Sequence, residues 1–395
     1  MSTLRLLTAS GETTSVDLAE GGRYTRPEHP LRSRVAYAAA HVVPRVVADN
    51  TPGRPADIDW DATLAFRRNV YSWGLGVADA MDTAQRNMGL DARATRELIA
   101  RSAEVAREEG GHVVVGVNTD HVEDATLSID GVIDAYTEQL HFTEEQGAGP
   151  VLMASRHLAR AAVGAEDYRR VYRAVLAAAT TPVVLHWLGP AFDPELEGYF
   201  GSPDWRTASE VLLEIIAESP DRVAGVKMSL LDAESEVAVR ARLPHGVRMF
   251  TGDDFNYVGL IGGDEVPAAT QPEGTGHSDA LLGAFAAITP VASAAIQALD
   301  AGDAEAYLRI LGPTEELSRQ VFAAPTFYYK TGVAFLSWLN GHQPAFQMVG
   351  GLHSARSLPH LSRIVELANG ALALERPELA RERWHGMLRL NGVDA

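Results

Sequence analysis

The residue with the clearest chemical potential is Lys227, in the middle of the apolar run AGVKMSLLDA (224–233). It is one of only two lysines among 34 basic residues, and the other is Lys330. Burial disfavours an ammonium ion and lowers its pKa, which leaves a free amine at neutral pH. A free amine in a dry pocket attacks carbonyl carbons and forms a Schiff base. The alternative is a strand-end lysine that forms a salt bridge with Asp253 or Asp254.

The elements that position Lys227 are predicted from short apolar runs that alternate with longer segments of helical period. This alternation is typical of a parallel sheet with crossover helices. The predicted strands are RVAYAAAHVV (34–43), WGLGVADA (73–80), HVVVGVNT (112–119), GPVLMA (149–154), PVVLHWL (182–188), VAGVKMS (223–229), VRMFTGD (247–253) and ALLGAFAAI (280–288). Eight such units over roughly 250 residues predict a (β/α)8 barrel. No G-x-G-x-x-G motif follows a predicted strand, which argues against a doubly wound sheet.

This periodicity divides the chain into three parts. Residues 1–33 are polar and rich in turn-forming residues, and they predict an N-terminal arm or hairpin. The barrel spans 34–295, and residues 296–395 form a C-terminal helical region packed on it. The Gly/Pro-rich stretch 262–279 predicts a loop near the barrel mouth that closes over it or contacts a neighbouring subunit.

Polar side chains follow the predicted strands at the points where barrel active sites are built. Because these ends converge on one face, we expect a polar ring around the amine of Lys227. Its members are Asp79, Asp82, Thr83, Asn118, Thr119, Asp120, His121, Ser155, Arg156, His157, His186, Trp187, Ser229, Gly252, Asp253 and Asp254.

Two segments resemble the dihydrodipicolinate synthase and N-acetylneuraminate lyase family of Schiff-base aldolases and lyases. Gly225-Val226-Lys227-Met228-Ser229 is similar to the family's lysine segment at the end of the sixth strand. Thr251-Gly252-Asp253-Asp254 is similar to its S-G-D-D segment after the seventh strand, and the offset of 252 − 227 = 25 is typical. The resemblance covers about residues 34–345. It implies imine formation at Lys227 and a homo-oligomer, either a dimer or a tetramer.

The chain departs from the family's pattern at two strand ends. His186 falls where the family carries a proton-shuttling tyrosine, and Trp187 replaces the asparagine that follows it. A histidine, whose ordinary pKa is near neutral, can transfer the same protons. Asp82-Thr83-Ala84-Gln85-Arg86 falls where the family binds a substrate carboxylate, and only one hydroxyl is kept. This change puts pyruvate as the imine-forming partner in doubt.

A charged clamp on the substrate is a further possibility in the rebuilt loop. Arg86 or Arg156 would supply it, although a structural role is the commoner one for an arginine. The synthase branch of the family carries an arginine shortly after the tyrosine, and PVVLHWLGPAFD (182–193) offers none. This absence argues against dihydrodipicolinate synthesis itself. Residues 324–341 are similar to the family's final helices, which are expected to lie away from the substrate.

These observations predict a Schiff-base-forming lyase or aldolase that acts on a keto acid or keto-sugar derivative. Lys227 forms the imine and His186 moves protons. The predicted substrate-binding residues are Thr83, Asp82, Asn118, Ser155, Trp187, Ser229, Gly252, Asp253 and Asp254. The hypothesis needs no cofactor and no metal.

Two other functions stay open. A metal-dependent barrel aldolase or sugar isomerase would use histidines and acids at the strand ends. The candidates for such a site are His41, His112, His121, His157, His186, His277, Asp79, Asp82, Asp120, Asp253 and Asp254. A catalytically inactive binding protein would fit the altered strand-two loop.

Composition excludes several classes of protein. The formal net charge of −18 argues against nucleic acid as a partner, because phosphate binding needs a basic surface. The absence of cysteine removes disulfides, thiolate metal sites and cysteine nucleophiles. The first residues lack the apolar core of a signal peptide, and no run is long enough for a membrane span. We therefore expect a cytoplasmic protein with a small-molecule substrate and no membrane partner.

Overall fold

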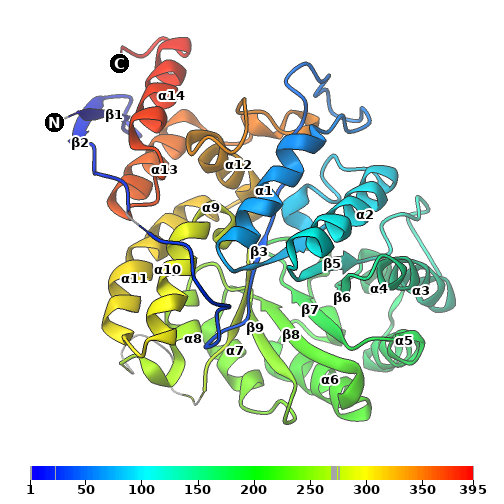
Figure 1. Ribbon diagram of the computed structural model, residues 1–395. Helices are drawn as coiled ribbons and strands as arrows, with labels where there is room; N and C mark the ends of the chain where they lie inside the picture. Colours follow the sequence, from blue (N-terminus) through cyan, green and yellow to red (C-terminus); the bar gives the residue numbers. More distant parts are fainter. Residues whose placement is uncertain (1, 23, 268–273, 275, 395) are drawn as a thin grey trace.

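The computed structural model describes residues 2–22, 24–267, 274 and 276–394. Its centre is a closed barrel of eight parallel strands in the order β10-β3-β4-β5-β6-β7-β8-β9 (Figure 1). The strands are β3 (Ala36–Ala39), β4 (Gly76–Asp79), β5 (Val113–Val117), β6 (Gly149–Met153), β7 (Val183–Leu188), β8 (Val223–Ser229), β9 (Arg248–Thr251) and β10 (Asp279–Leu282). The predicted (β/α)8 barrel is confirmed.

The outer layer consists of helices that follow the strands. They are α1 (Trp60–Ser72), α2 (Ala92–Glu109), α3 (Ile129–Glu145), α4 (Arg156–Ala161), α5 (Ala165–Ala178), α6 (Trp205–Glu218), α7 (Ala233–Arg240), α8 (Tyr257–Gly262), α9 (Gly283–Ala287) and α10 (Thr289–Asp300). Several begin at a residue whose side chain accepts a hydrogen bond from a first-turn N–H, as Asp59, Asp91, Ser128, Asp204 and Asp232 do. These caps fix where each helix starts.

The barrel interior is closed by its own apolar cluster, distinct from the core between strands and helices. The cluster contains Ala39, Ala78, Met81, Val114, Val151, Met153, Val184, Phe250 and Leu281. Side chains alternate between the two faces of a strand, so every second residue points inward. Polar side chains at the carboxyl ends therefore rest on a packed apolar floor.

The C-terminal region is helical, as predicted. It contains α11 (Ala304–Val321), α12 (Tyr329–Leu339), α13 (Leu358–Gly370) and α14 (Pro377–Leu390). An antiparallel pair formed by β1 (Thr3–Leu7) and β2 (Thr13–Asp17) lies beside α13 and α14, where both chain ends are found (Figure 1). The N–H of Leu7 donates to Ser362 Oγ at 2.7 Å, and Trp384 Nε1–H donates to the carbonyl of Arg5 at 2.6 Å.

Two details of the sequence prediction are wrong. The last predicted strand, 280–288, ends as a strand at Leu282, and its second half is the helix α9. The loop predicted near the mouth includes 268–273 and 275, which lie outside the described residues. The residues that precede this gap lie at the opposite end of the barrel: Arg34, which precedes β3, donates to the carbonyl of Gly262 and to the Glu265 carboxylate. The described residues on the two sides of this gap follow α8 and precede β10, and the start of β10 is at the amino end of the strands.

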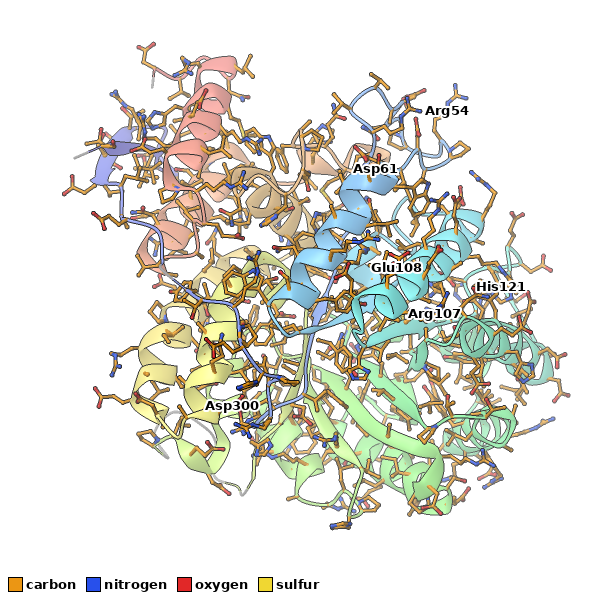
Figure 2. The ribbon with its side chains drawn as sticks, viewed as in Figure 1. Arg54, Asp61, Arg107, Glu108, His121 and Asp300 are labelled. Carbon is orange, nitrogen blue, oxygen red and sulfur yellow. The ribbon has the colours of Figure 1, made fainter. Side chains whose placement is uncertain are left out.

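Charged side chains cover the outer helices (Figure 2). Glu108, near the end of α2, accepts a hydrogen bond from Arg68 on α1 at 2.5 Å.

Within the described residues, no helix combines the length and apolarity needed to cross a membrane.

Candidate active site

Lys227 lies inside the barrel, at the carboxyl end of β8. Its Cα is in register with His186 on β7 and with Phe250 on β9, and Phe250 belongs to the interior cluster. Only 5% of its surface is exposed. The sequence prediction that this strand holds an amine at the barrel mouth agrees with this position.

The amine of Lys227 has no direct partner in the described part of the chain, because no acceptor lies within hydrogen-bond or ion-pair distance of Nζ. Burial lowers the pKa of Lys227, while the nearby carboxylates of Asp82 and Asp254 oppose that shift without cancelling it. The predicted alternative of a salt bridge with Asp253 or Asp254 is therefore absent. The site favours a free amine more than water does.

Gly252 makes room for the lysine side chain. A Cβ at this position would lie 2.1 Å from Ser229 Oγ and 2.8 Å from Lys227 Cε. The N–H of Gly252 donates to the carbonyl of Met228 at 2.7 Å. A glycine is needed here because the end of β9 passes directly beside the amine-bearing chain.

The two aspartates after β9 have different roles. Asp253 accepts hydrogen bonds from the N–H of Phe255 at 2.9 Å and from Asn256 Nδ2 at 2.8 Å, so it holds the loop. Asp254 accepts from the N–H of Ala284 at 2.9 Å and is buried. Burial raises the pKa of Asp254 to about 8, although the Ala284 N–H and the Lys227 charge lower it. Burial therefore favours the protonated form of this carboxyl group more than solvent does.

His186 is a neutral imidazole in this position. Its Nε2 lies 3.1 Å from Ser229 Oγ, and its Nδ1 is buried with no hydrogen-bond partner among the described residues. Burial, with a smaller contribution from the Lys227 charge, lowers the pKa of His186 well below its usual value. The sequence argument used the ordinary pKa of a solvated ring, and burial shifts His186 away from that value.

Trp187 does not face the site. Its ring packs edge-on against Phe200 at a centroid distance of 5.3 Å, in the core between strands and helices. Neighbouring residues of a strand point to opposite faces, so His186 inside the barrel places Trp187 outside. The prediction that Trp187 binds substrate is wrong.

Three other predicted residues have local partners. Ser155 Oγ accepts from the N–H of Leu158 at 3.2 Å, which caps α4, and lies 2.6 Å from Thr119 Oγ1. Asn118 Oδ1 accepts from the N–H of Thr119 at 2.7 Å. Thr83 Oγ1 lies 2.7 Å from the phenol oxygen of Tyr329 on α12. Among these three predicted residues, Asn118 alone lines the cavity described next.

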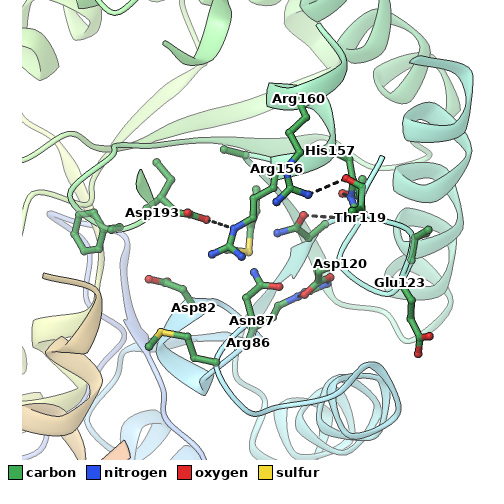
Figure 3. Close-up of a pocket in the computed structure, with 18 of the residues that line it drawn as sticks. Asp82, Arg86, Asn87, Thr119, Asp120, Glu123, Arg156, His157, Arg160 and Asp193 are labelled. Carbon is green, nitrogen blue, oxygen red and sulfur yellow. Dashed lines mark hydrogen bonds and ion pairs between the residues drawn. The ribbon is translucent and has the colours of Figure 1, made fainter. Parts of the chain in front are cut away.

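A cavity of about 290 Å³ lies at the carboxyl ends of β4 to β7 (Figure 3). Its titratable lining residues are Asp82, Arg86, Asp120, Glu123, Asp124, Arg156, His157, Arg160, Asp193 and Lys330. Figure 3 shows Asp82, Arg156 and Asp193 around its open centre. Lys227 lies beyond this lining, and Asp82 connects the two places, since it lines the cavity and its charge acts on the lysine.

Arg86 is a structural arginine. It donates twice to the Asp120 carboxylate, at 2.7 Å each, and at 2.7 Å to Gln139 Oε1. Its remaining donors reach the carbonyls of Ala80 and Gly116. Arg156 donates to Asp193 at 2.6 Å from the cavity rim. Of the two arginines considered as a clamp, Arg156 is the one with donor capacity left at the cavity.

Sequence comparison identifies the family. Residues 4–393 match the model of the family described as "Protein of unknown function (DUF993)". The chain belongs to this family. No curated protein matches the sequence of this DUF993 chain.

Solved structures share the fold of the DUF993 chain. Dihydrodipicolinate synthase from Aquifex aeolicus superposes with a TM-score of 0.64 at 12% identity, over 85% of this chain and 97% of that chain. The synthase from Oceanobacillus iheyensis gives 0.63 at 14% identity, over 86% and 96%. KD(P)GA from T. tenax gives 0.58 at 17% identity, over 87% and 99%. The predicted resemblance is confirmed at the level of the fold.

Sequence reasoning missed the contribution of α12 to the DUF993 site. The phenol of Tyr329 donates to the Asp82 carboxylate at 3.0 Å, and Lys330 lines the cavity. Residues 324–341 were expected to lie away from the substrate, and this expectation is wrong. One signal was present in the sequence. The chain has only two lysines, and the structure places both at this end of the barrel.

The predicted metal alternative finds no geometric support in the DUF993 chain. Within the described residues, no three histidine or acidic side chains come together as a metal site. His41 Nε2 lies 2.9 Å from Gln343 Oε1, and His157 Nδ1 lies 2.8 Å from Thr119 Oγ1. Asp79 is buried and accepts a hydrogen bond from Arg67 Nε at 2.9 Å.

Proposed function

We propose that this protein is a Schiff-base-forming lyase or aldolase that acts on a keto acid or keto sugar through Lys227. One observation carries the proposal: the Lys227 amine is buried inside a barrel mouth, has no direct partner among the described residues and has a lowered pKa. A buried amine that forms no hydrogen bond and no ion pair destabilises a fold, so its presence is explained best by chemistry. The solved structures named above support the fold that this chemistry uses.

The proposed reaction begins at the amine. The Nζ lone pair forms a C–N bond with the substrate carbonyl carbon, and the carbonyl oxygen leaves as water after it gains two protons. When the neighbouring C–C bond breaks, the protonated imine accepts its electron pair and becomes an enamine. The substrate hydroxyl loses its proton as the other fragment leaves as a carbonyl compound. Protonation of the enamine and hydrolysis by one water release the second fragment and restore the amine.

We assign these proton transfers to two side chains. Asp254, protonated below about pH 8, donates to the departing oxygen. His186, neutral because burial lowers its pKa, is the base for the substrate hydroxyl and acts with Ser229. Asp82 and Asn118 face the cavity and hydrogen-bond substrate hydroxyls. Assembly into a dimer or tetramer and a cytoplasmic location stay predictions.

Borohydride trapping tests the proposal directly. The protein is incubated with pyruvate or with dihydroxyacetone, reduced with borohydride and digested, and the modified peptide is located by mass spectrometry. We expect a reduced adduct at Lys227 with at least one probe. Lys330 is the built-in control, because the two lysines are the only side-chain amines that compete. An adduct at Lys330 alone, or none with either probe, would overturn the imine at Lys227.

The pH dependence of turnover tests the role of Asp254. A donor with a pKa of about 8 is protonated below that pH and loses its proton as the pH rises through it. We therefore expect kcat/KM to fall above about pH 8. Asp254→Asn should lower the rate about 100-fold and remove this alkaline limb. If kcat/KM of the variant still falls at alkaline pH, a group other than Asp254 causes that fall.

A further inference from the structure

A groove of about 820 Å³ lies in the C-terminal region, where α12, α13 and α14 come together near both chain ends (Figure 1). Its lining includes the rings of Trp338 and Phe346, which stack with their centroids 5.9 Å apart and their planes at 25°. Leu379, Met387 and Leu390 of α14 extend this apolar surface, and the side chain of Leu390 is 89% exposed. The size and the largely apolar lining are typical of a site for a small molecule.

The groove is separate from the cavity at the barrel mouth. Helix α12 contributes to both places, with Lys330 near its first turn at the cavity and Trp338 near its last turn at the groove. Eight residues of α-helix separate these two positions by about 12 Å. Among the described residues, none lines both places. A ligand of the groove is therefore a different molecule from a substrate held at the barrel mouth.

Two arginines of the groove carry charges that no acid matches. Arg356 Nη2 donates to the carbonyl of Ala323 at 2.6 Å, and its Nε is buried without a hydrogen-bond partner. Arg383 donates through Nη1 to the carbonyls of Trp338 and Gln343. In the part of the chain that the structure describes, neither arginine forms an ion pair with a carboxylate. The groove thus holds unmatched positive charge beside an apolar surface.

Arg383 is fixed in place and still has donors to offer. Its carbonyl bonds hold the guanidinium carbon 5.6 Å from the centroid of the Trp338 ring. Nε and Nη2 have no hydrogen-bond partner among the described residues, and both reach solvent. Burial and the Arg376 charge lower the pKa of Arg383, although the Glu382 charge opposes them, so an anion in the groove would stabilise this cation. A guanidinium held in this way is suited to bind a carboxylate.

We propose that this groove binds an organic carboxylate from solution, with the carboxylate on Arg383 and an apolar chain or ring against Trp338 and Met387. The charge of the groove decides between this occupant and a second copy of the chain. A symmetric pair would place the arginines of one groove opposite the same arginines of the other, and like charges repel. A small anion meets the unmatched cations without that repulsion. The proposal does not depend on the chemistry of Lys227.

Octanoate tests the site by isothermal titration calorimetry. Octan-1-ol has the same chain without the charge, and acetate has the charge without the chain. We expect octanoate to bind at least about 10-fold more tightly than either. In Arg383→Met its Kd should rise about 10- to 100-fold, while binding of octan-1-ol stays constant. Arg381→Met is the matched control, because Arg381 lies on the same helix but pairs with Glu378 at 2.9 Å outside the groove, and it should change neither value.

A second variant fills the groove without removing a charge. Gly386 of α14 belongs to the lining, and a Cβ built there meets only Arg389 Nη2, at 3.9 Å. The side chain of Gly386→Leu therefore enters open space, and leucine favours a helix more than glycine does. We expect a melting temperature equal to or above that of the wild type, together with at least a 10-fold rise in Kd for both octanoate and octan-1-ol. This variant tests the site even if Arg383→Met unfolds, since its fold is expected to be kept.

Four results would overturn the proposal. If octanoate binds equally to the wild type, Arg383→Met and Gly386→Leu, the anion is held elsewhere. If octan-1-ol binds as tightly as octanoate, the groove does not recognise charge. If octanoate does not bind below millimolar concentration, the groove is not a site for such carboxylates. If sedimentation shows a dimer for the wild type and a monomer for Gly386→Leu, a second copy covers the groove instead.

Discussion

Turnover of any keto acid that traps at Lys227 is expected to fall about 10,000-fold in Lys227→Met, which corresponds to about 5 kcal/mol in activation free energy. The loss is large because the amine is the atom that forms the C–N bond, and a thioether cannot replace it. Folding should be kept. The substitution removes a buried polar group without a direct partner, so the free energy of unfolding is expected to stay equal or to rise.

Steady-state kinetics and urea unfolding, run on the same preparation, measure the two effects. Lys227→Arg is the matched control, because it places a permanent cation in the site and offers no free amine. Both variants should be inactive, with unfolding midpoints that differ. Turnover above one tenth of the wild-type value in either variant would show that the reaction does not pass through an imine at Lys227.

The strands of this barrel could be predicted from local pattern. Each strand is a short apolar run bounded by turn residues, and this pattern can be recognised without knowing which side chains pack against the strand. The helix starts also depend on local sequence, since the side chains of Asp59 and Asp91 cap the first turns of α1 and α2. The end of β10 was misjudged because ALLGAFAAI is apolar throughout, and an unbroken apolar run does not distinguish a buried strand from a buried helix.

The sequence predicted correctly the position of those site residues that lie on the strands themselves. Lys227 and His186 were found because a strand end fixes both position and direction. The alternation rule could also have removed Trp187, which follows an inward residue directly. The lowered pKa of His186 could not be predicted, since it depends on burial by parts of the chain distant in sequence.

The contribution of α12 lies beyond local pattern altogether. Tyr329 meets Asp82 across 247 positions of sequence, and only tertiary packing brings them together. Helical period predicts that α12 exists but does not indicate which end points at the barrel mouth. The rarity of lysine was the one available signal, and it marks Lys330 as clearly as Lys227.

A second large effect is expected at the ion pair that ties β4 to α1. Arg67 donates to the Asp79 carboxylate through Nε at 2.9 Å and Nη2 at 2.8 Å, and both side chains are fully buried. Ser102 Oγ also donates to Asp79, and the Thr63 carbonyl accepts from Arg67 at 3.0 Å. Arg67→Met should lower the free energy of unfolding by about 3–5 kcal/mol, because it leaves a buried carboxylate without its cation.

The adjacent arginine is a matched control for this loss. Arg68 forms ion pairs with Glu108 and Glu109 on the surface, at 2.5 and 3.0 Å, so Arg68→Met should cost less than about 1 kcal/mol. Urea unfolding measures both variants. The double variant Arg67→Met with Asp79→Asn should recover part of the loss, because it also removes the unpaired charge. A loss at Arg67 no larger than that at Arg68 would mean that Asp79 does not need its cation. The argument against Asp79 as a metal ligand, which depends on its ion pair with Arg67, would then be weakened.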